Sequence, residues 1–210
     1  MVKMKGRIFL SVGFLLSAWA CGGPHYFDLQ TDIPENRGNY KIDKVLLVED
    51  VEANDTYRDY RIVYRKSPFQ VKYHHAAQWS KPPDDLIEDA VVFFWKKRGI
   101  FKKVNAYGSG DDPDWTMKIY IAAIERVQTQ KKWHARLALE MEITDTESNE
   151  IVLVHSFDRK SLLGMGGLAM IPQKISAILH EELLKVEAKL MKSGGTAGDS
   201  PGGALPAAGR

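Results

Sequence analysis

The chain has 210 residues, 44% of them hydrophobic and 27% charged, which is typical of one globular domain and excludes a disordered or fibrous chain. Its single cysteine excludes an internal disulfide and a zinc site built from thiolates. The formal net charge is +2, but without residues 1–20 there are 26 basic residues against 27 acidic ones, so we expect no nucleic-acid partner.

Residues 1–20 have the three parts of an export signal. A basic start with Lys3, Lys5 and Arg7 precedes the apolar run IFLSVGFLL, and small residues follow as far as Ala20. The apolar run is too short to span a bilayer as a helix, so we expect a secretory signal peptide. An unpaired cysteine just after it, in an exported protein, needs a reason.

The residues around Cys21 resemble the lipobox of bacterial lipoproteins, in which the cysteine is acylated and becomes the new N-terminus. Ala20 fits the position before the cysteine, whereas Ala18 and Trp19 depart from the usual pattern. The resemblance implies a covalent lipid such as palmitate on Cys21, and no other cofactor is expected. Gly22 stands where an aspartate would signal inner-membrane retention, which implies a periplasm-facing protein of the outer membrane. The alternative is a generic signal peptide cut near Ala20.

The composition divides the remaining chain into three parts. Residues 21–43 are rich in Gly, Pro, Asp and Asn, which is typical of a tether. Residues 193–210 are mostly Gly, Ala, Pro and Ser, and cannot bury enough apolar surface to offset the entropy of ordering, so we expect them to be disordered. Residues 44–192 form the predicted domain.

Three strands and a helix are predicted in the first half of this domain. The strands are the β-rich runs at residues 44–51, 61–64 and 69–75. The helix begins at Pro83, because proline suits a first turn, and ends at Gly99 after three basic residues. Its apolar stripe comprises Leu86, Ile87, Ala90, Val91 and Phe94.

The second half predicts four strands and a final helix. The strands are residues 100–104, 115–129, 133–144 and 151–157, with a hairpin turn over residues 130–132. In the third of them, apolar residues alternate with polar ones, which predicts one buried and one solvated face. The buried face comprises Trp133, Ala135, Leu137, Leu139, Met141 and Ile143. The helix covers about 168–191, with apolar residues at helical spacing, namely Ile171, Ile175, Leu179, Leu183, Val186 and Leu190.

The predicted order is therefore β-β-β-α-β-β-β-β-α. Single-faced strands and two amphipathic helices indicate an α+β fold, a two-layer sandwich in which a mixed or antiparallel sheet carries both helices on one face.

No catalytic or metal-binding arrangement stands out. The adjacent His74 and His75 would point to opposite faces of a strand, and His180 lacks a second histidine at the spacing of a zinc-protease helix. The acidic loop at residues 111–114 lacks the ligand spacing of a calcium loop, and the glycines at 164–167 lack the residues of a phosphate-binding loop. We therefore expect a protein that is not an enzyme.

A stretch of about 45 residues resembles a known family. YRIVYRKSPFQVKY at residues 60–73, WSKPP at residues 79–83, and then Gly99, Phe101 and Val104 are similar to the pattern of the ABC-type transport auxiliary lipoproteins. A looser match at residues 26–29 extends the resemblance to about 21–191. The polar run at residues 51–59 departs from the family, which often has a Pro-Tyr-Leu element there.

The resemblance implies an accessory of ABC transporters that move lipids between membranes. Its implied partners are a substrate-binding protein with mammalian-cell-entry (MCE) domains and the ABC permease complex, and a homo-oligomer stays open. The alternative hypotheses are an outer-membrane assembly or scaffold lipoprotein, and an exported lipid hydrolase. Five residues have two interpretations, as partner contacts or as packing at the start of the helix; they are Arg65, Tyr73, Trp79, Pro82 and Pro83. Of these, Trp79 has the large rigid side chain that interfaces favour.

Overall fold

A computed structural model describes residues 23, 25–30, 40–109 and 112–193. The N-terminal signal, Cys21 and the tail after residue 193 lie outside the described residues. The elements in chain order are β1 His25–Phe27, β2 Ile42–Val48, β3 Glu52–Ala53, η1 Asp55–Tyr57, β4 Arg61–Ser67, β5 Gln70–Trp79, α1 Pro83–Arg98, β6 Phe101–Asn105, β7 Trp115–Thr129, β8 Lys132–Asp145, β9 Ile151–Leu162, η2 Gly164–Ala169 and α2 Met170–Ser193.

The long strand β7 organises the sheet. Along one edge it pairs in parallel with β2, β3 and β4 in turn, at residues 115–117, 120–121 and 125–127. Along the other edge it pairs antiparallel with β8, which pairs with β9. Beyond β4 lie β5 and then β1, and beyond β2 lies β6. The sheet is therefore mixed, and the expected α+β class is confirmed.

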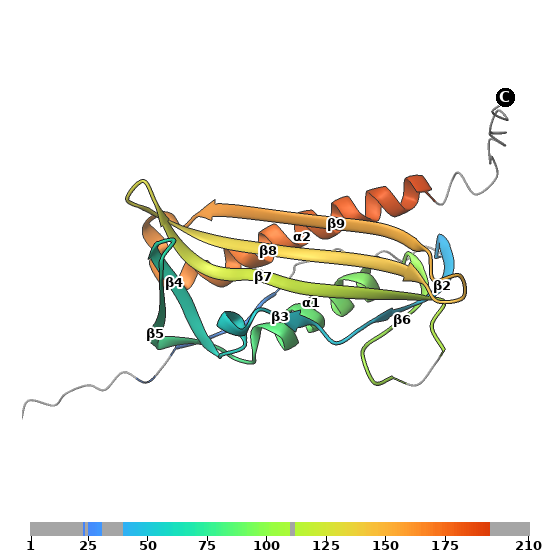
Figure 1. Ribbon diagram of the computed structural model, residues 1–210, viewed down its shortest axis with the longest axis horizontal. Helices are drawn as coiled ribbons and strands as arrows, with labels where there is room; N and C mark the ends of the chain where they lie inside the picture. The colour runs from blue at the N-terminus through green and yellow to red at the C-terminus, as the bar shows by residue number, and fades with distance from the viewer. Residues whose placement is uncertain (1–22, 24, 31–39, 110–111, 194–210) are drawn as a thin grey trace, which may run out of the picture.

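Both helices lie behind the long strands in the view of Figure 1. Helix α2 packs against β8 and β9, and α1 packs against β6, β2 and β3. All six residues of the stripe expected on α2 are buried, as are all five expected on α1. The core lies between these helices and the sheet, so the opposite face of β7–β9, which we call the outer face, is left without a helix.

Local sequence explains where α1 begins and ends. Pro83 occupies its first turn with Asp84 and Asp85, and Gly99 adopts a left-handed conformation with φ 57° at its end. The Gly99 N–H donates to the Trp95 carbonyl at 3.0 Å, which closes the last turn. A residue without a side chain suits that conformation, so the predicted helix limits are confirmed.

The β7–β8 hairpin turns on two residues in left-handed conformations, Gln130 at φ 50° and Lys131 at φ 63°. Thr129 and Lys132 already pair across it, so the turn is shorter than the three residues expected. The alternation expected in β8 is confirmed for residues 135–143, whose odd-numbered side chains are buried.

A shift in the pairing register of β7 decides which of its side chains face the core. Met117, Ile119 and Ile121 point inward, but a bulge between Ile121 and Ala123 reverses the alternation. Ile124 then pairs with the inward Leu137, and Glu125 pairs with Arg136 on the outer face. Without this bulge, the carboxylate of Glu125 would enter the apolar core.

Part of the predicted tether belongs to the sheet, which corrects its boundary. His25–Phe27 form β1 and pair in parallel with residues 77–79 of β5, and Leu29 is buried. The domain therefore includes residues before residue 44. Backbone hydrogen bonds and the burial of one apolar neighbour are enough to hold a short edge strand in place, so β1 needs no apolar pattern of its own. Strand β9 also continues to Leu162, five residues past its expected end.

Candidate functional site

The structure places two of the proposed contact residues in the core. Trp79 is 1% exposed and Pro83 is buried, while Pro82 is partly buried at the start of α1. The backbone N–H of Trp79 donates to the Tyr60 carbonyl at 2.6 Å. A buried side chain cannot meet a partner, so the hypothesis that Trp79 and Pro83 are contacts is wrong, and the packing interpretation holds for both.

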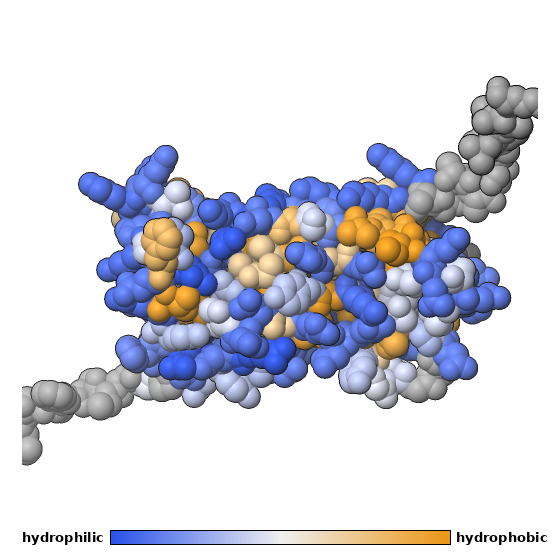
Figure 2. All heavy atoms as spheres, viewed as in Figure 1, coloured by the Kyte–Doolittle hydropathy of each residue, from blue (hydrophilic) through white to orange (hydrophobic). Residues whose placement is uncertain are grey.

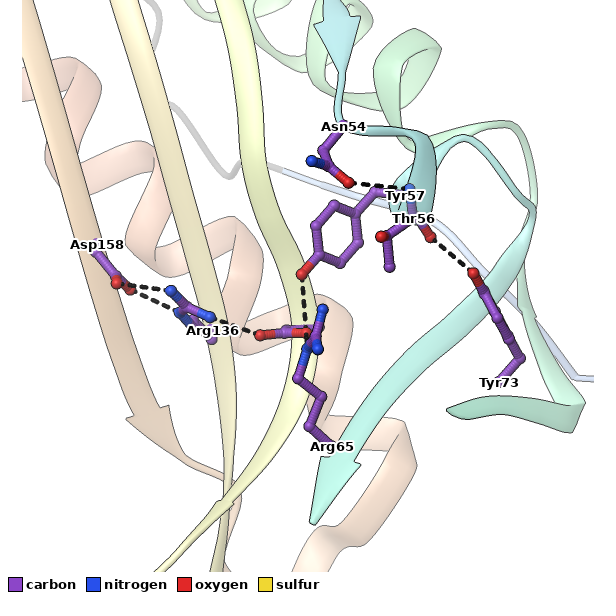
Figure 3. Close-up of polar contacts among 8 residues, drawn as sticks. Asn54, Thr56, Tyr57, Arg65, Tyr73, Arg136 and Asp158 are labelled. Atoms are coloured by element: carbon purple, nitrogen blue, oxygen red, sulfur yellow. Dashed lines mark hydrogen bonds and ion pairs between the residues drawn. The ribbon is translucent and has the colours of Figure 1, made fainter. Parts of the chain in front are cut away.

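Arg65 belongs to a cluster around a carboxylate with no exposed side-chain surface, that of Glu125 on β7 (Figure 3). The Arg65 Nε donates to Glu125 Oε2 at 2.7 Å, and Arg136 from β8 donates to Oε1 at 2.7 Å. The hydroxyl of Tyr57 in η1 donates to Oε2 at 2.9 Å. Four elements that are separate in the sequence therefore share one buried negative charge.

The cluster is completed on β9. Arg136 makes two hydrogen bonds of 2.8 Å to the carboxylate of Asp158, in the fork arrangement of a bidentate pair. Hydrogen bonding to Arg136 holds the pKa of Asp158 below its usual range. The two arginines and two carboxylates balance, which reduces the cost of burying Glu125.

Two tyrosines tie the η1 region to these strands. Burial, together with the nearby charge of Glu125, raises the pKa of Tyr57 to about 12, so its hydroxyl stays protonated and donates. Tyr73 is half-buried, its hydroxyl lies 3.4 Å from the Thr56 carbonyl oxygen, and the Arg61 guanidinium lies 4.6 Å from its ring centroid. These contacts are within the fold, so Tyr73 packs rather than reaching outward.

The outer face carries two hollows of opposite charge. One, of about 190 Å³, lies over the Glu125 cluster and is rimmed by basic residues, including Lys66 and Lys160. The other, of about 480 Å³, lies between the β2–β3 segment and β7–β8. Its acidic residues outnumber its one lysine, Lys118; they are Glu49, Asp50, Glu52, Glu140 and Glu142. Figure 2 shows this face as mostly hydrophilic, with apolar patches between.

The sequence could not reveal the Glu125 cluster, because its members lie on β4, β7, β8, β9 and η1 without a motif. The only signal is Glu125 itself, an acid within the apolar strand WTMKIYIAAIERV.

The Glu125 carboxylate is fully engaged within the fold. Among the hydrogen bonds of the described residues, none joins a serine or threonine hydroxyl to a histidine. Within the same residues, no three His, Cys, Asp or Glu side chains gather as metal ligands would. Glu125 is occupied by three donors and shielded from solvent, which leaves the exposed charged residues around it available for contacts.

A second buried carboxylate, Glu182, joins α2 to β9. It is 1% exposed and lies 2.8 Å from His155 Nε2, 3.0 Å from Arg159 and 2.6 Å from Lys185. Burial raises the pKa of Glu182, but hydrogen bonds from these three side chains outweigh it and hold the pKa below its usual range. The nearby His180 on α2 packs edge-on against the ring of Phe94 on α1, with 5.8 Å between the ring centroids.

This depressed pKa predicts acid sensitivity. A carboxylate whose pKa is lowered by folding stabilises the protein above its unfolded pKa, and that contribution is lost as pH falls through the folded value. We expect the free energy of unfolding to decrease between about pH 5 and pH 3, and Glu182→Gln to reduce stability at neutral pH while flattening that decrease. Urea unfolding at several pH values measures this, with the exposed Glu150→Gln as control. An unchanged pH profile in Glu182→Gln would contradict the assignment.

Comparison with known proteins identifies the family of this chain. A family model described as the ABC-type transport auxiliary lipoprotein component matches residues 27–177. The chain belongs to this family. The resemblance carried by residues 60–104 is thereby confirmed, and the transport auxiliary lipoprotein is a component of the cell envelope with an auxiliary role in transport.

Solved structures share the fold of the transport auxiliary lipoprotein. The crystal structure of a Xanthomonas campestris protein is 18% identical with a TM-score of 0.70, covering 82% of this chain and 100% of that one. That of an uncharacterized protein is 14% identical with a TM-score of 0.64, covering 80% and 99%. At such identities the likeness concerns the fold alone. A search of curated proteins gives no match. None of the helices that the structure describes is long and apolar enough to cross a membrane.

Proposed function

We propose that this protein is a non-enzymatic accessory of an ABC-type, MCE-type system that carries lipids between membranes. Its family match over residues 27–177 is the observation that carries the proposal. A lipid on Cys21 attaches the protein to the outer membrane, with the domain in the periplasm. Its partners are the MCE-domain protein and the permease complex, and copies of the chain can also assemble with one another.

The outer face is the surface we assign to the partner. It has no helix over it, and its two hollows set a basic region beside an acidic one along the same strands. Opposite charges at fixed positions favour one orientation of a charged partner and speed its association. The segment before α1, proposed from the sequence, is less suited because Trp79 and Pro83 face the core.

Crosslinking in native membranes tests this function. The wild-type chain should recover an MCE-domain protein or a permease subunit. Charge reversal on the outer face, Glu52→Lys with Glu140→Lys, should reduce the recovery at matched protein levels, because both side chains are exposed in the acidic hollow. The control is Lys96→Glu, exposed on α1. Recovery of neither partner with the wild type would reject the transport role and favour the assembly or scaffold hypothesis.

Membrane attachment should depend on Cys21. The exported Cys21→Ser chain keeps the domain but has no thiol to acylate, and the acyl chains would otherwise contribute about 0.8 kcal/mol for each buried CH₂. We expect it in the soluble periplasmic fraction after a salt wash, whereas the wild type stays with membranes. Quantitative sedimentation of the washed variant with membranes would contradict the lipid attachment.

A further inference from the structure

Three turns of the chain lie side by side at one end of the sheet. The β4–β5 turn follows Ser67, the β7–β8 turn follows Thr129, and β9 ends at Leu162. Strand pairing brings them together, because β4 pairs with β7, β7 with β8, and β8 with β9 near these ends. We call residues 66–72, 128–133 and 160–169 the turn end. In Figure 1 it lies on the left, where the β4–β5 and β7–β8 turns project.

The turn end has a charge unlike that of the rest of the chain. It contains five lysines and no acidic residue, although the mature chain is close to neutral. The lysines are all exposed; they are Lys66, Lys72, Lys131, Lys132 and Lys160. Lys160 is near enough to Asp158 to help lower the pKa of that carboxyl. Cations gathered at one end of the sheet repel one another, so they favour a surface that supplies negative charge.

Apolar side chains project between these lysines. Phe69, at the tip of the β4–β5 turn, is 96% exposed, and Met165 in η2 is fully exposed. Leu162 and Val71 are also exposed at this end. In Figure 2 apolar atoms protrude among hydrophilic ones at the same end. An aromatic ring held in water at the tip of a turn contributes nothing to the core, so it suits an external apolar medium.

The predicted lipid site lies close to the sheet in the sequence. β1 runs parallel to β5, and His25 pairs with Ala77 near the end of β5 that lies away from the turn. Cys21 lies outside the described residues and precedes His25 by four positions, which extended chain spans in at most about 14 Å. A lipid on Cys21 would therefore keep the domain next to the membrane, and the charge and exposed apolar side chains of the turn end single it out as the part that makes contact.

From these features we infer that the turn end binds the surface of a bilayer containing anionic phospholipids. Phe69 and Met165 insert below the headgroups, and the five lysines lie against the lipid phosphates. A lipid chain combined with a basic patch gives firmer membrane binding than either alone, and cations near an anionic surface act together. This contact would fix the orientation of the domain on the membrane, with α2 leading away from it. Lys66 and Lys160 also rim the basic hollow of the outer face, but Lys72, Lys131 and Lys132 do not, so these three lysines separate the membrane contact from the partner's.

Vesicle sedimentation of the exported Cys21→Ser chain tests the inference without the lipid. The chain should bind vesicles of phosphatidylglycerol and phosphatidylethanolamine, bind phosphatidylcholine vesicles much less, and dissociate at about 0.5 M salt, where charges are screened. In the same background, Lys131→Glu with Lys132→Glu should weaken binding at least about tenfold. Phe69→Ala with Met165→Ala should weaken it to a similar extent, about tenfold, by removing buried apolar area.

Two matched controls separate the turn end from general charge and hydrophobicity. Lys96→Glu with Lys118→Glu reverses two exposed lysines elsewhere, and Tyr107→Ala with Ile151→Ala removes two exposed apolar side chains away from the turn end. Both should bind anionic vesicles like the parent, and unchanged thermal midpoints would show that every variant is folded. Failure of the parent to bind anionic vesicles, or equal losses in variants and controls, would overturn the inference. Neither result would affect the crosslinking test of the transport role.

Discussion

Trp79→Ala should lower the free energy of unfolding by about 3–5 kcal/mol, because it empties the space of a large side chain inside a packed core. Trp79 is 1% exposed at the end of β5, immediately before the segment that begins α1. Trp79 belongs to the buried core cluster, so its removal leaves a cavity among packed side chains. Urea unfolding of the wild type and the variant measures the loss.

Tyr26→Ala is the matched control for this truncation. Tyr26 lies on β1, pairs with the residue before Trp79, and is 64% exposed. Its removal should change stability by no more than about 0.5 kcal/mol. A Trp79→Ala chain that is as stable as the control, but no longer crosslinks to a partner, would restore Trp79 as a contact residue.

Glu125→Gln should lower the free energy of unfolding by about 3–5 kcal/mol, because it leaves Arg65 and Arg136 without the charge that they share in a buried site. The glutamine side chain has nearly the same shape as the glutamate that it replaces, so the loss reports on charge and hydrogen bonding rather than on volume. Urea unfolding measures it. The exposed Glu140→Gln on the same face should change stability by no more than about 0.5 kcal/mol.

A double variant distinguishes an uncompensated charge from a lost attraction. Glu125→Leu with Arg65→Leu removes one member of each sign and leaves Arg136 with Asp158. If the cost of losing Glu125 comes from stranded arginines, the double variant should be more stable than Glu125→Leu alone. If the double variant loses as much stability as Glu125→Leu alone, or as much as the two single variants added together, then attraction between the charges stabilises the cluster. In that case the stranded arginines would not be the source of the cost.

If Trp79→Ala and Glu125→Gln both fold but are less stable as expected, Trp79 and Glu125 have different structural roles. Trp79 and the other core residues hold the sheet against the helices. The Glu125 cluster joins β4, β7, β8 and β9, and so keeps the outer face rigid beneath its charged rim. A rigid face loses less entropy when a partner binds. The turn end borders this cluster, since Lys66 and Lys160 line the hollow over Glu125, but its exposed apolar side chains contribute nothing to the core.

Periodicity and local signals accounted for most of the secondary structure. The stripes of α1 and α2 and the alternation of β8 are properties of neighbouring residues, so they can be recognised in one dimension. Proline at the start of α1 and glycine at its end fix the helix for reasons of backbone geometry alone. The short strand β1 gave no such signal, since three residues are too few to show a period and their pairing depends on β5.

The sequence by itself determined the α+β class, both helices, the long strands and the family of this protein, because each depends on local pattern or on motifs within a single stretch. The tertiary structure alone decided that Trp79 is core and that Glu125 is shared by two arginines. One bulge in β7 turns Glu125 to the outer face, and only strand pairing brings Arg65 and Arg136 to it. Burial and long-range charge pairing depend on what the fold places nearby, and no local pattern records that.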